Sequence, residues 1–177
     1  MKDYIIQTNR LGLRKWKPED LVPFAEMNSD PKVMEFFPHT LTKEESDAFA
    51  NKIINDFNAK GFGLYAVDEL SSGEFIGFIG LSIPTFESNF TPCVEIGWRI
   101  AHRFWGKGYA PEGADACIKY ANETLNILEI VSFTATINKK SIRVMEKIGM
   151  NYCGTFNHPK VDINSVLCEH VLYKLEK

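Results

Sequence analysis

The chain has 177 residues, of which 45% are hydrophobic and 24% are charged. This length and composition predict one globular domain spanning 1–177 and exclude a wholly disordered chain. The formal net charge of -3 argues against a protein held mainly on phosphate backbones, because nucleic-acid binders usually carry a clearly basic surface.

Hydrophobic periodicity divides the chain into seven strands and four helices. Strands are predicted where apolar residues alternate or β-branched residues cluster, and helices where apolar residues recur every three to four positions. The clearest helix has Thr42 and Glu45 at capping-box spacing and ends at Gly61. In chain order, the pattern predicts a strand over 10–16, helices over 17–28 and 42–61, strands over 61–67, 74–83 and 93–100, a helix over 111–126, a strand over 128–137, a helix over 141–149, and strands over 150–156 and 165–175.

The order of these elements predicts the fold class. A run of antiparallel strands followed by a strand–helix–strand unit is typical of an α/β (α+β) protein with a mixed sheet. A doubly wound parallel sheet is excluded, because helices do not alternate with every strand. The alternation in strand 93–100 separates two faces. One face carries Val94, Ile96, Trp98 and Ile100, and the other carries Glu95, Gly97 and Arg99.

Neither the cysteines nor the first residues indicate an exported or membrane-bound protein. The four cysteines stand far apart, which predicts buried reduced thiols and no zinc site. Residues 1–16 lack the apolar core of a signal peptide, and no apolar run approaches the ~20 residues of a membrane-spanning helix. We therefore expect a cytoplasmic protein. The cysteines are Cys93, Cys117, Cys153 and Cys168.

A glycine-rich turn joins strand 93–100 to the next helix and reads RFWGKGYAPEG from Arg103. Amides at a helix start are unsatisfied and lie at the positive end of the helix dipole. Glycines let such amides approach a phosphate, to which Arg103 and Lys107 would add charge. Pro111 has no N–H. The expected donors are the amides of Gly106, Lys107, Gly108, Tyr109 and Ala110.

Two common nucleotide-binding patterns do not fit this turn. The phosphate loop of ATPases requires Ser or Thr after its lysine, whereas Lys107 is followed by glycine. The dinucleotide pattern has Pro111 where its third glycine belongs. These residues alone leave a second interpretation open, in which the turn connects a strand to a helix and binds no ligand.

The pattern R-x-x-G-x-G-x-A, from Arg103 to Ala110, resembles the pyrophosphate loop of the GNAT superfamily of acetyl-CoA-dependent N-acetyltransferases. The segments VEIGWRIAHRFWGKGYAPEGA, NKKSIRVMEKIGM, HVLYKL and RLGLRKW resemble the branch that includes the ribosomal-protein N-terminal acetyltransferases, so the resemblance runs nearly end to end. It implies a mixed, mostly antiparallel sheet of about seven strands, splayed between strands 4 and 5 and flanked by about four helices.

The resemblance implies transfer of an acetyl group from acetyl-CoA to a primary amine, by direct attack in a ternary complex and without a metal. The acceptor would be a protein N-terminus or a small-molecule amine. A CoA-binding module without turnover, serving regulation or assembly, is the alternative. Neither a nucleic acid nor a membrane is an expected partner, and a homodimer is possible by analogy with related proteins.

The resemblance also implies site residues. Glu95 is expected to be the general base, acting through water; alternatively, its carboxylate pairs with Arg99. Asn138 is expected to bind the pantetheine amides, to cap a helix, or both. Ser141 is expected near the cofactor sulfur; alternatively, it bonds the start of its own helix. The expected cofactor-binding residues are Trp98, Arg99 and Ile100 through their main chain, Arg103, Gly106, Lys107, Gly108, Tyr109, Ala110 and Asn138, and the expected catalytic residues are Glu95 and Ser141.

The sequence does not identify the general acid that would protonate the thiolate. Many family members have a tyrosine one helical turn beyond Ser141, where this chain has Met145. Ser141, water, Tyr152 or Tyr173 would then give the proton to the thiolate. Loop residues His39 and His158 are candidates for the acceptor pocket, and His170 is expected to be structural. The aromatic residues expected to form core or pocket wall are Phe36, Phe37, Phe86, Phe90 and Trp105.

Overall fold

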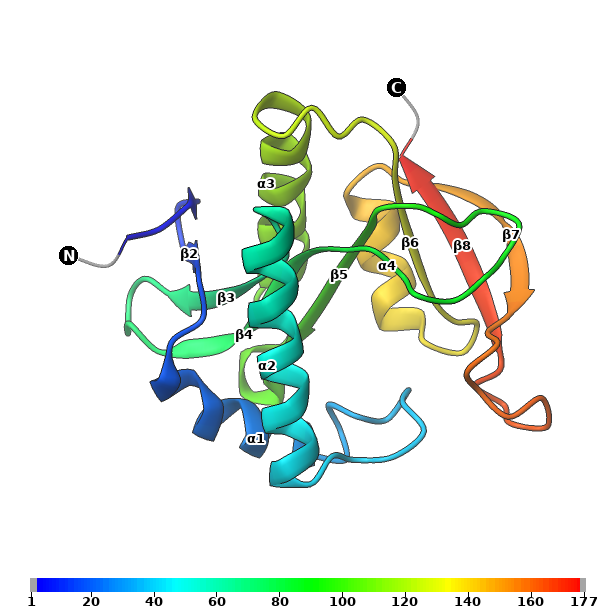
Figure 1. Ribbon diagram of the computed structural model, residues 1–177, viewed down its shortest axis with the longest axis horizontal. Coiled ribbons are helices and arrows are strands. Elements are labelled where there is room, and N and C mark those ends of the chain that lie inside the picture. Colours follow the sequence, from blue (N-terminus) through cyan, green and yellow to red (C-terminus); the bar gives the residue numbers. More distant parts are fainter. Residues whose placement is uncertain (1–2, 176–177) are drawn as a thin grey trace.

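One open sheet organises the computed structural model, which describes residues 3–175 (Figure 1). The eight strands lie in the order β1-β2-β3-β4-β5-β6-β8-β7, and all neighbours pair antiparallel except β5 and β6. This confirms the mixed, mostly antiparallel sheet. The strands are β1(Ile6–Gln7), β2(Leu11–Arg14), β3(Leu64–Glu69), β4(Phe75–Ser82), β5(Glu95–Ile100), β6(Ile130–Ala135), β7(Asn151–Asn157) and β8(Glu169–Leu175).

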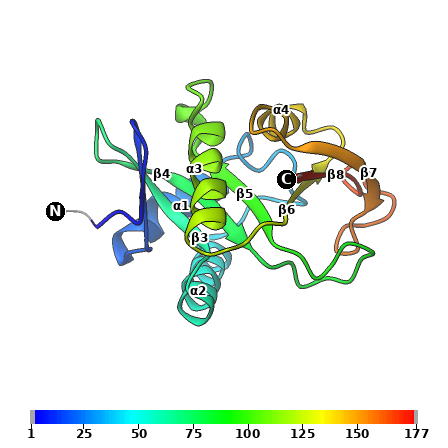
Figure 2. The same ribbon diagram turned by 90° about the horizontal axis from the view of Figure 1, so that it is seen from above.

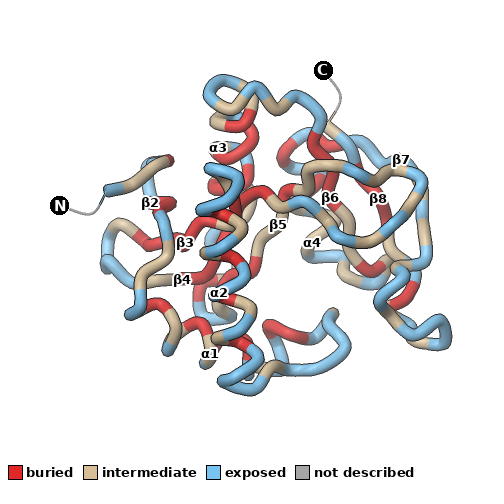
Figure 3. The backbone as a smooth tube through the Cα atoms, viewed as in Figure 1, coloured by how far each residue is buried: buried red, intermediate tan, exposed pale blue. Residues whose placement is uncertain are grey.

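Helices cover both faces of the sheet. Figure 2 shows α3 and α4 on one side and α2 on the other. The core is divided accordingly: one buried cluster joins α3 and α4 to the central strands, and a second joins α1 and α2 to Phe78 of β4. Buried segments concentrate in the central strands and inner helix turns (Figure 3). The helices are α1(Leu21–Ser29), α2(Lys43–Lys60), α3(Tyr109–Glu123) and α4(Lys139–Lys147), with short 3-10 helices η1(Pro18–Asp20) and η2(His102–Phe104).

The sheet splays between β5 and β6. Their parallel pairing consists of one residue pair, Glu95 with Val131, supported by the Val131 amide, which donates to the Val94 carbonyl at 2.9 Å. The Ser132 hydroxyl then donates to the Ile96 carbonyl at 2.9 Å, and the two strands separate. These strands are the fourth and fifth of the seven predicted from sequence, so the predicted splay is confirmed.

Helix α2 follows its sequence signals closely. The Glu45 amide donates to Thr42 Oγ1 at 3.2 Å, and the Thr42 amide donates to the Glu45 carboxylate at 2.9 Å, which completes the capping box. Gly61 has a φ of 77° and ends the helix in the left-handed conformation. Local hydrogen bonding therefore fixes both ends of α2.

Other boundaries differ from the prediction. The strand β1 was not predicted, so the sheet has eight strands instead of seven. The first helix begins as the 3-10 turn η1. Helices α3 and α4 each begin two residues before the predicted start, because their caps are Gly108 and Asn138, which precede the apolar periodicity.

The predicted cysteine environment is partly correct. All four cysteines are free thiols, and Cys117 and Cys168 are buried. Cys93 is half-buried, and Cys153 on β7 is exposed, contrary to the prediction of buried thiols. Within residues 3–175, no group of His, Cys, Asp and Glu side chains is arranged to hold a metal, and no helix is long and apolar enough to cross a membrane.

Candidate active site

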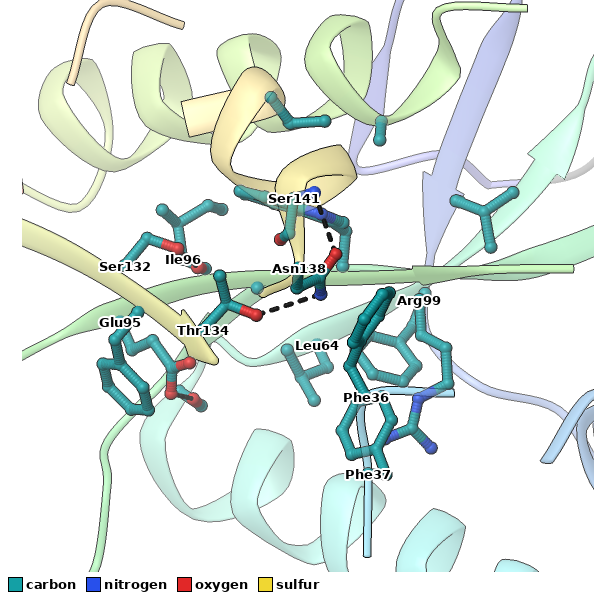
Figure 4. Close-up of a pocket in the computed structure, with 18 of the residues that line it drawn as sticks. Phe36, Phe37, Leu64, Glu95, Ile96, Arg99, Ser132, Thr134, Asn138 and Ser141 are labelled. Atoms are coloured by element: carbon teal, nitrogen blue, oxygen red, sulfur yellow. Dashed lines mark hydrogen bonds between the residues drawn. The ribbon is translucent and has the colours of Figure 1, made fainter. Parts of the chain in front are cut away.

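A cleft of about 830 Å³ opens where β5 and β6 part. It is lined by the start of α3, one side of α4, the inner side of α2, the segment between β7 and β8, and the start of β8. Figure 4 shows β5 running through it, with Asn138 and Ser141 on one side of the strand and Glu95 and Arg99 on the other. The cleft therefore has two compartments that meet along β5.

The glycine turn occupies one end of the cleft. Gly106 and Gly108 have φ values of 77° and 81°, and Gly108 is the N-cap of α3. Within residues 3–175, none of the five amides from Gly106 to Ala110 donates to a protein acceptor. Arg10 holds the turn from outside, donating to the Lys107 carbonyl at 2.8 Å. The turn thus leaves these amides without a protein acceptor in the described part of the chain, an arrangement that suits an anion.

The two basic side chains of the turn are already engaged with the β3–β4 hairpin. Arg103 forms an ion pair with Glu74 at 3.4 Å, and Lys107 forms one with Glu69 at 3.3 Å. Hydrogen bonds from Tyr109 and Ser72, together with the Lys107 ammonium, lower the pKa of Glu69 to about 2. Neither Arg103 nor Lys107 lines the cleft, so an anion there meets main-chain amides first.

The three residues of β5 that were predicted to bind pantetheine do not all turn their main-chain groups to the same side of the strand. The carbonyls of Val94 and Ile96 accept hydrogen bonds from β6, whereas the Ala101 amide, just after β5, donates to the Ile76 carbonyl of β4. Because successive residues of a strand point their main-chain groups to opposite sides, Trp98 and Ile100 face the gap. The main chain of Arg99 faces β4, which argues against its predicted contact with the cofactor.

Glu95 lies at the point where the sheet opens. Its carboxylate accepts a hydrogen bond from the Ser82 hydroxyl at 3.1 Å. Burial raises its pKa to about 7, and the Ser82 hydrogen bond opposes this rise. No ion pair joins Glu95 to Arg99 within residues 3–175, so the alternative reading of this carboxylate is wrong. A carboxyl group that titrates near neutrality suits proton transfer.

Replacing Ser82 with alanine is expected to raise the pKa of Glu95 above its value of about 7. The hydroxyl stabilises the charged carboxylate, and losing one such hydrogen bond shifts a pKa by up to about one unit. Titration of a ¹³C-labelled Glu95 carboxyl by NMR measures the change. The exposed Ser29→Ala variant is the control, and an unchanged Glu95 midpoint in Ser82→Ala would contradict the assigned hydrogen bond.

Asn138 caps α4, as one of the predicted alternatives states. Its Oδ1 accepts from the Ser141 amide at 3.2 Å, and its Nδ2 donates to Thr134 Oγ1 at 3.0 Å (Figure 4). A carboxamide has two N–H donors and two acceptor lone pairs, so one donor remains for a ligand in the cleft. Ser141 also lines the cleft, and within residues 3–175 its hydroxyl makes no hydrogen bond.

Neither tyrosine proposed as a proton donor reaches the cleft, and Met145, which occupies the position of the usual tyrosine, does not reach it either. Met145 is fully buried in the core. Tyr152 is exposed on β7, and the Tyr173 hydroxyl faces Glu146 at 3.5 Å. None of the three lines the cleft within the described part of the chain. Of the predicted donors, Ser141 and water remain.

The histidines differ in position. His39 is exposed beside Glu45 and lies outside the cleft lining. His158 and His170 both line the cleft, with ring centroids 4.9 Å apart. Burial, together with the His170 and Lys160 charges, lowers the pKa of His158 to about 4, so it is a weak proton acceptor.

Aromatic side chains form much of the cleft wall, as expected from sequence. The exception is Phe90, which packs behind Phe86 with ring centroids 6.1 Å apart and does not line the cleft. Sequence reasoning missed Phe133 and Thr134 of β6, because a β-branched and aromatic strand gives no sign of which residues face a ligand. The predicted aromatic residues that line the cleft are Phe36, Phe37, Phe86 and Trp105.

Comparison with known proteins agrees with this geometry. Residues 10–151 match the family model described as an acetyltransferase (GNAT) domain. The chain is 36% identical over 151 residues to uncharacterized protein YkkB of Bacillus subtilis, covering 84% of this chain and 86% of that protein. It is 35% identical over 158 residues to the FsC-acetyl coenzyme A-N(2)-transacetylase of Aspergillus fumigatus, covering 85% of this chain and 66% of that protein.

A solved structure shares the whole fold. The crystal structure of an acetyltransferase (GNAT family) from Bacillus anthracis superposes with a TM-score of 0.79 at 30% identity, and the match covers 96% of each chain. The structural match therefore spans nearly the whole chain.

Proposed function

The chain belongs to the GNAT family of acetyltransferases, and from that premise we propose that it transfers acetyl from acetyl-CoA to a primary amine by direct attack in a ternary complex. Homology supports acetyl-CoA as the donor, since the Aspergillus fumigatus relative is itself named as an acetyl coenzyme A transacetylase. The observation that carries the proposal is that Gly106, Gly108, Tyr109 and Ala110, whose amides have no protein acceptor within residues 3–175, line the same cleft as Glu95.

The phosphates of acetyl-CoA would lie against the start of α3. The amides there have no protein acceptor among residues 3–175, and they stand at the positive end of the α3 dipole. The pantetheine arm would continue along the gap side of β5, where the main chain of Trp98 offers hydrogen bonds. The remaining donor of Asn138 would face the arm from α4.

The acetyl group would then lie beside Glu95. A neutral amine attacks the thioester carbonyl carbon, the C–N bond forms, and the tetrahedral intermediate collapses as the C–S bond breaks. Glu95 receives the proton from nitrogen, directly or through water. Ser141 or a water gives a proton to the departing thiolate. Holding both substrates in line contributes up to about 7–11 kcal/mol to lowering the barrier.

An amine screen tests this proposal. Purified protein is incubated with acetyl-CoA and a panel of primary amines that includes peptides with free N-termini, and free thiol is measured. We expect thiol release with at least one amine. Acetyl-CoA binding without thiol release for any amine would favour the alternative, a CoA-binding module without turnover.

A thermal-shift measurement checks the cosubstrate separately. A ligand that binds only the folded protein adds about 2.7 kcal/mol of stability at 100 times its Kd. Acetyl-CoA is expected to raise the Tm clearly, whereas ATP and NAD are expected to change it little. Equal shifts with all three would contradict the assignment of the turn.

A further inference from the structure

Arg99 is a buried cation on the Glu95 side of β5. The residue is only 9% exposed and lines the cleft. Figure 4 shows it leaving the strand on the side opposite to Asn138 and Ser141, toward Phe37. The compartment that holds Arg99 is therefore not the one that Asn138 and Ser141 line.

The partners of this guanidinium are neutral. Its Nη1 donates to Asn28 Oδ1 at 2.8 Å, and Asn28 in turn donates to Ser46 Oγ at 2.8 Å. Nε is buried and has no hydrogen-bond partner. Aromatic rings surround the group, with centroids at 4.2 Å for Phe37, and 5.4 and 5.5 Å for two further rings.

The charge of Arg99 has no carboxylate partner within residues 3–175. Burial lowers its pKa to about 10, which leaves the group cationic at neutral pH. The chain treats its other buried arginine differently: Arg14 forms ion pairs with Asp20 and Asp68, both at 2.7 Å. Of the two arginines, only Arg99 lacks a counter-ion within residues 3–175. Because burying an unpaired charge is costly, a counter-ion supplied by a ligand would stabilise it.

We infer that Arg99 binds a carboxylate of the acceptor, so that the acceptor is an amine carrying an acid group. This inference rests on the proposed function. The acid group would complete the hydrogen bonding of the buried guanidinium, and a charge-assisted hydrogen bond is stronger than one between neutral groups. The rings around Arg99 would pack on the carbon chain between the two ends of the acceptor.

The spacing of Glu95 and Arg99 along β5 sets the distance between the amine and the carboxylate of the acceptor. Glu95 and Arg99 lie on one face of β5, four residues apart, which corresponds to about 13 Å between their Cα atoms. The amine must reach the Glu95 end while the carboxylate reaches Arg99. Acceptors with several bonds between amine and carboxylate, such as ω-amino acids and dipeptides, fit this spacing better than compact α-amino acids.

Matched acceptor pairs test the inference. Values of kcat/KM are measured for 4-aminobutanoate, 6-aminohexanoate and glycyl-leucine, and for the carboxamide of each, with wild type, Arg99→Met and the exposed-surface control Lys119→Gln. For the pair with the highest kcat/KM, we expect wild type and the control to show a kcat/KM at least tenfold higher for the carboxylate than for the carboxamide. Arg99→Met is expected to reduce that ratio to about one, through KM for the carboxylate.

A ratio near one for every pair in wild type, or a preference unchanged in Arg99→Met, overturns the inference. Thiol release with other amines but with none of these carboxylates also overturns it and leaves the proposed function standing. Because Arg99→Met removes an unpaired buried charge, its Tm is expected to equal or exceed that of wild type. If this variant does not fold, Phe37→Leu, at a residue 39% exposed, is expected to weaken the same preference.

A binding measurement separates the inference from the proposed function. With CoA present, 6-aminohexanoate is expected to raise the Tm of wild type and not of Arg99→Met, and 6-aminohexanamide is expected to raise neither. If no amine releases thiol, the proposed function fails, and this shift still decides whether Arg99 binds a carboxylate. Equal shifts in both proteins overturn the inference.

Discussion

Replacing Glu95 with glutamine is expected to lower kcat for acetyl transfer about 100-fold. A positioned general base contributes roughly 10²- to 10⁴-fold, and the lower end applies where water relays the proton. Glutamine keeps the shape of the side chain and its place beside Ser82 but cannot accept the proton. In wild type, the rate is expected to fall below pH 7, because burial raises the pKa of Glu95 to about 7. The variant is expected to lack this acidic limb.

The pH profile is the deciding measurement, since a merely structural glutamate would not set its midpoint. The exposed Glu129→Gln variant is the control and is expected to retain both rate and profile. An acidic limb that persists near pH 7 in Glu95→Gln would assign the base to another group.

Stability provides a second readout for Glu95. Folding raises the pKa of this carboxyl from 4.5 to about 7, so the folded state binds the proton more tightly. Its contribution to stability is present below pH 4.5 and is lost as the pH rises through about 7. The free energy of unfolding of Glu95→Gln, relative to wild type, is expected to increase by roughly 2 kcal/mol over that range, allowing for partial exposure. Urea unfolding at several pH values measures it.

The second large effect is expected from Gly108→Val, which should raise KM for acetyl-CoA about 100-fold. Gly108 has a φ of 81°, a conformation that costs other residues about 1–2 kcal/mol and costs β-branched residues more. An added Cβ would meet its nearest neighbour, Arg10 Nη2, at 3.6 Å, an ordinary contact. The expected damage therefore comes from the backbone: the turn must change shape, and its amides would no longer converge on a diphosphate.

Gly149→Val is the matched control. Gly149 follows α4, has a φ of 80°, and lies outside the cleft, so valine there introduces the same backbone strain far from the amides. Both variants are expected to lose stability, but only Gly108→Val should show a raised KM in steady-state kinetics with varied acetyl-CoA. A similar KM in the two variants would mean that the turn before α3 does not hold the phosphates.

Features that depend on local sequence were predictable. The capping box of α2 and the left-handed Gly61 are set by residues within one turn of each other, and both are as predicted. The turn before α3 is also local, because its glycines and the absence of an N–H at Pro111 determine which amides remain available. The two-residue β1 was missed, since two residues show no periodicity and the strand exists only by pairing with β2.

The environment of Arg99 was not predictable in the same way. Alternation along the strand placed its side chain on the Glu95 face, but its hydrogen-bond partner Asn28 is 71 residues away in sequence. The rings against it belong to α2, to β4 and to the segment after α1. No local pattern shows that these neighbours lack a carboxylate. Arg14 is paired with two acidic side chains and Arg99 with none, and this difference arises only from tertiary packing.

The parting of β5 from β6 has a consequence for solubility. A strand edge normally lies at the rim of a sheet, where exposed main-chain groups can template aggregation with other chains. Here the opening lies in the middle of the sheet, between walls formed by α2 and α4. Because helices flank this opening, its main-chain groups are less accessible to strands of other chains than those of an outer edge strand.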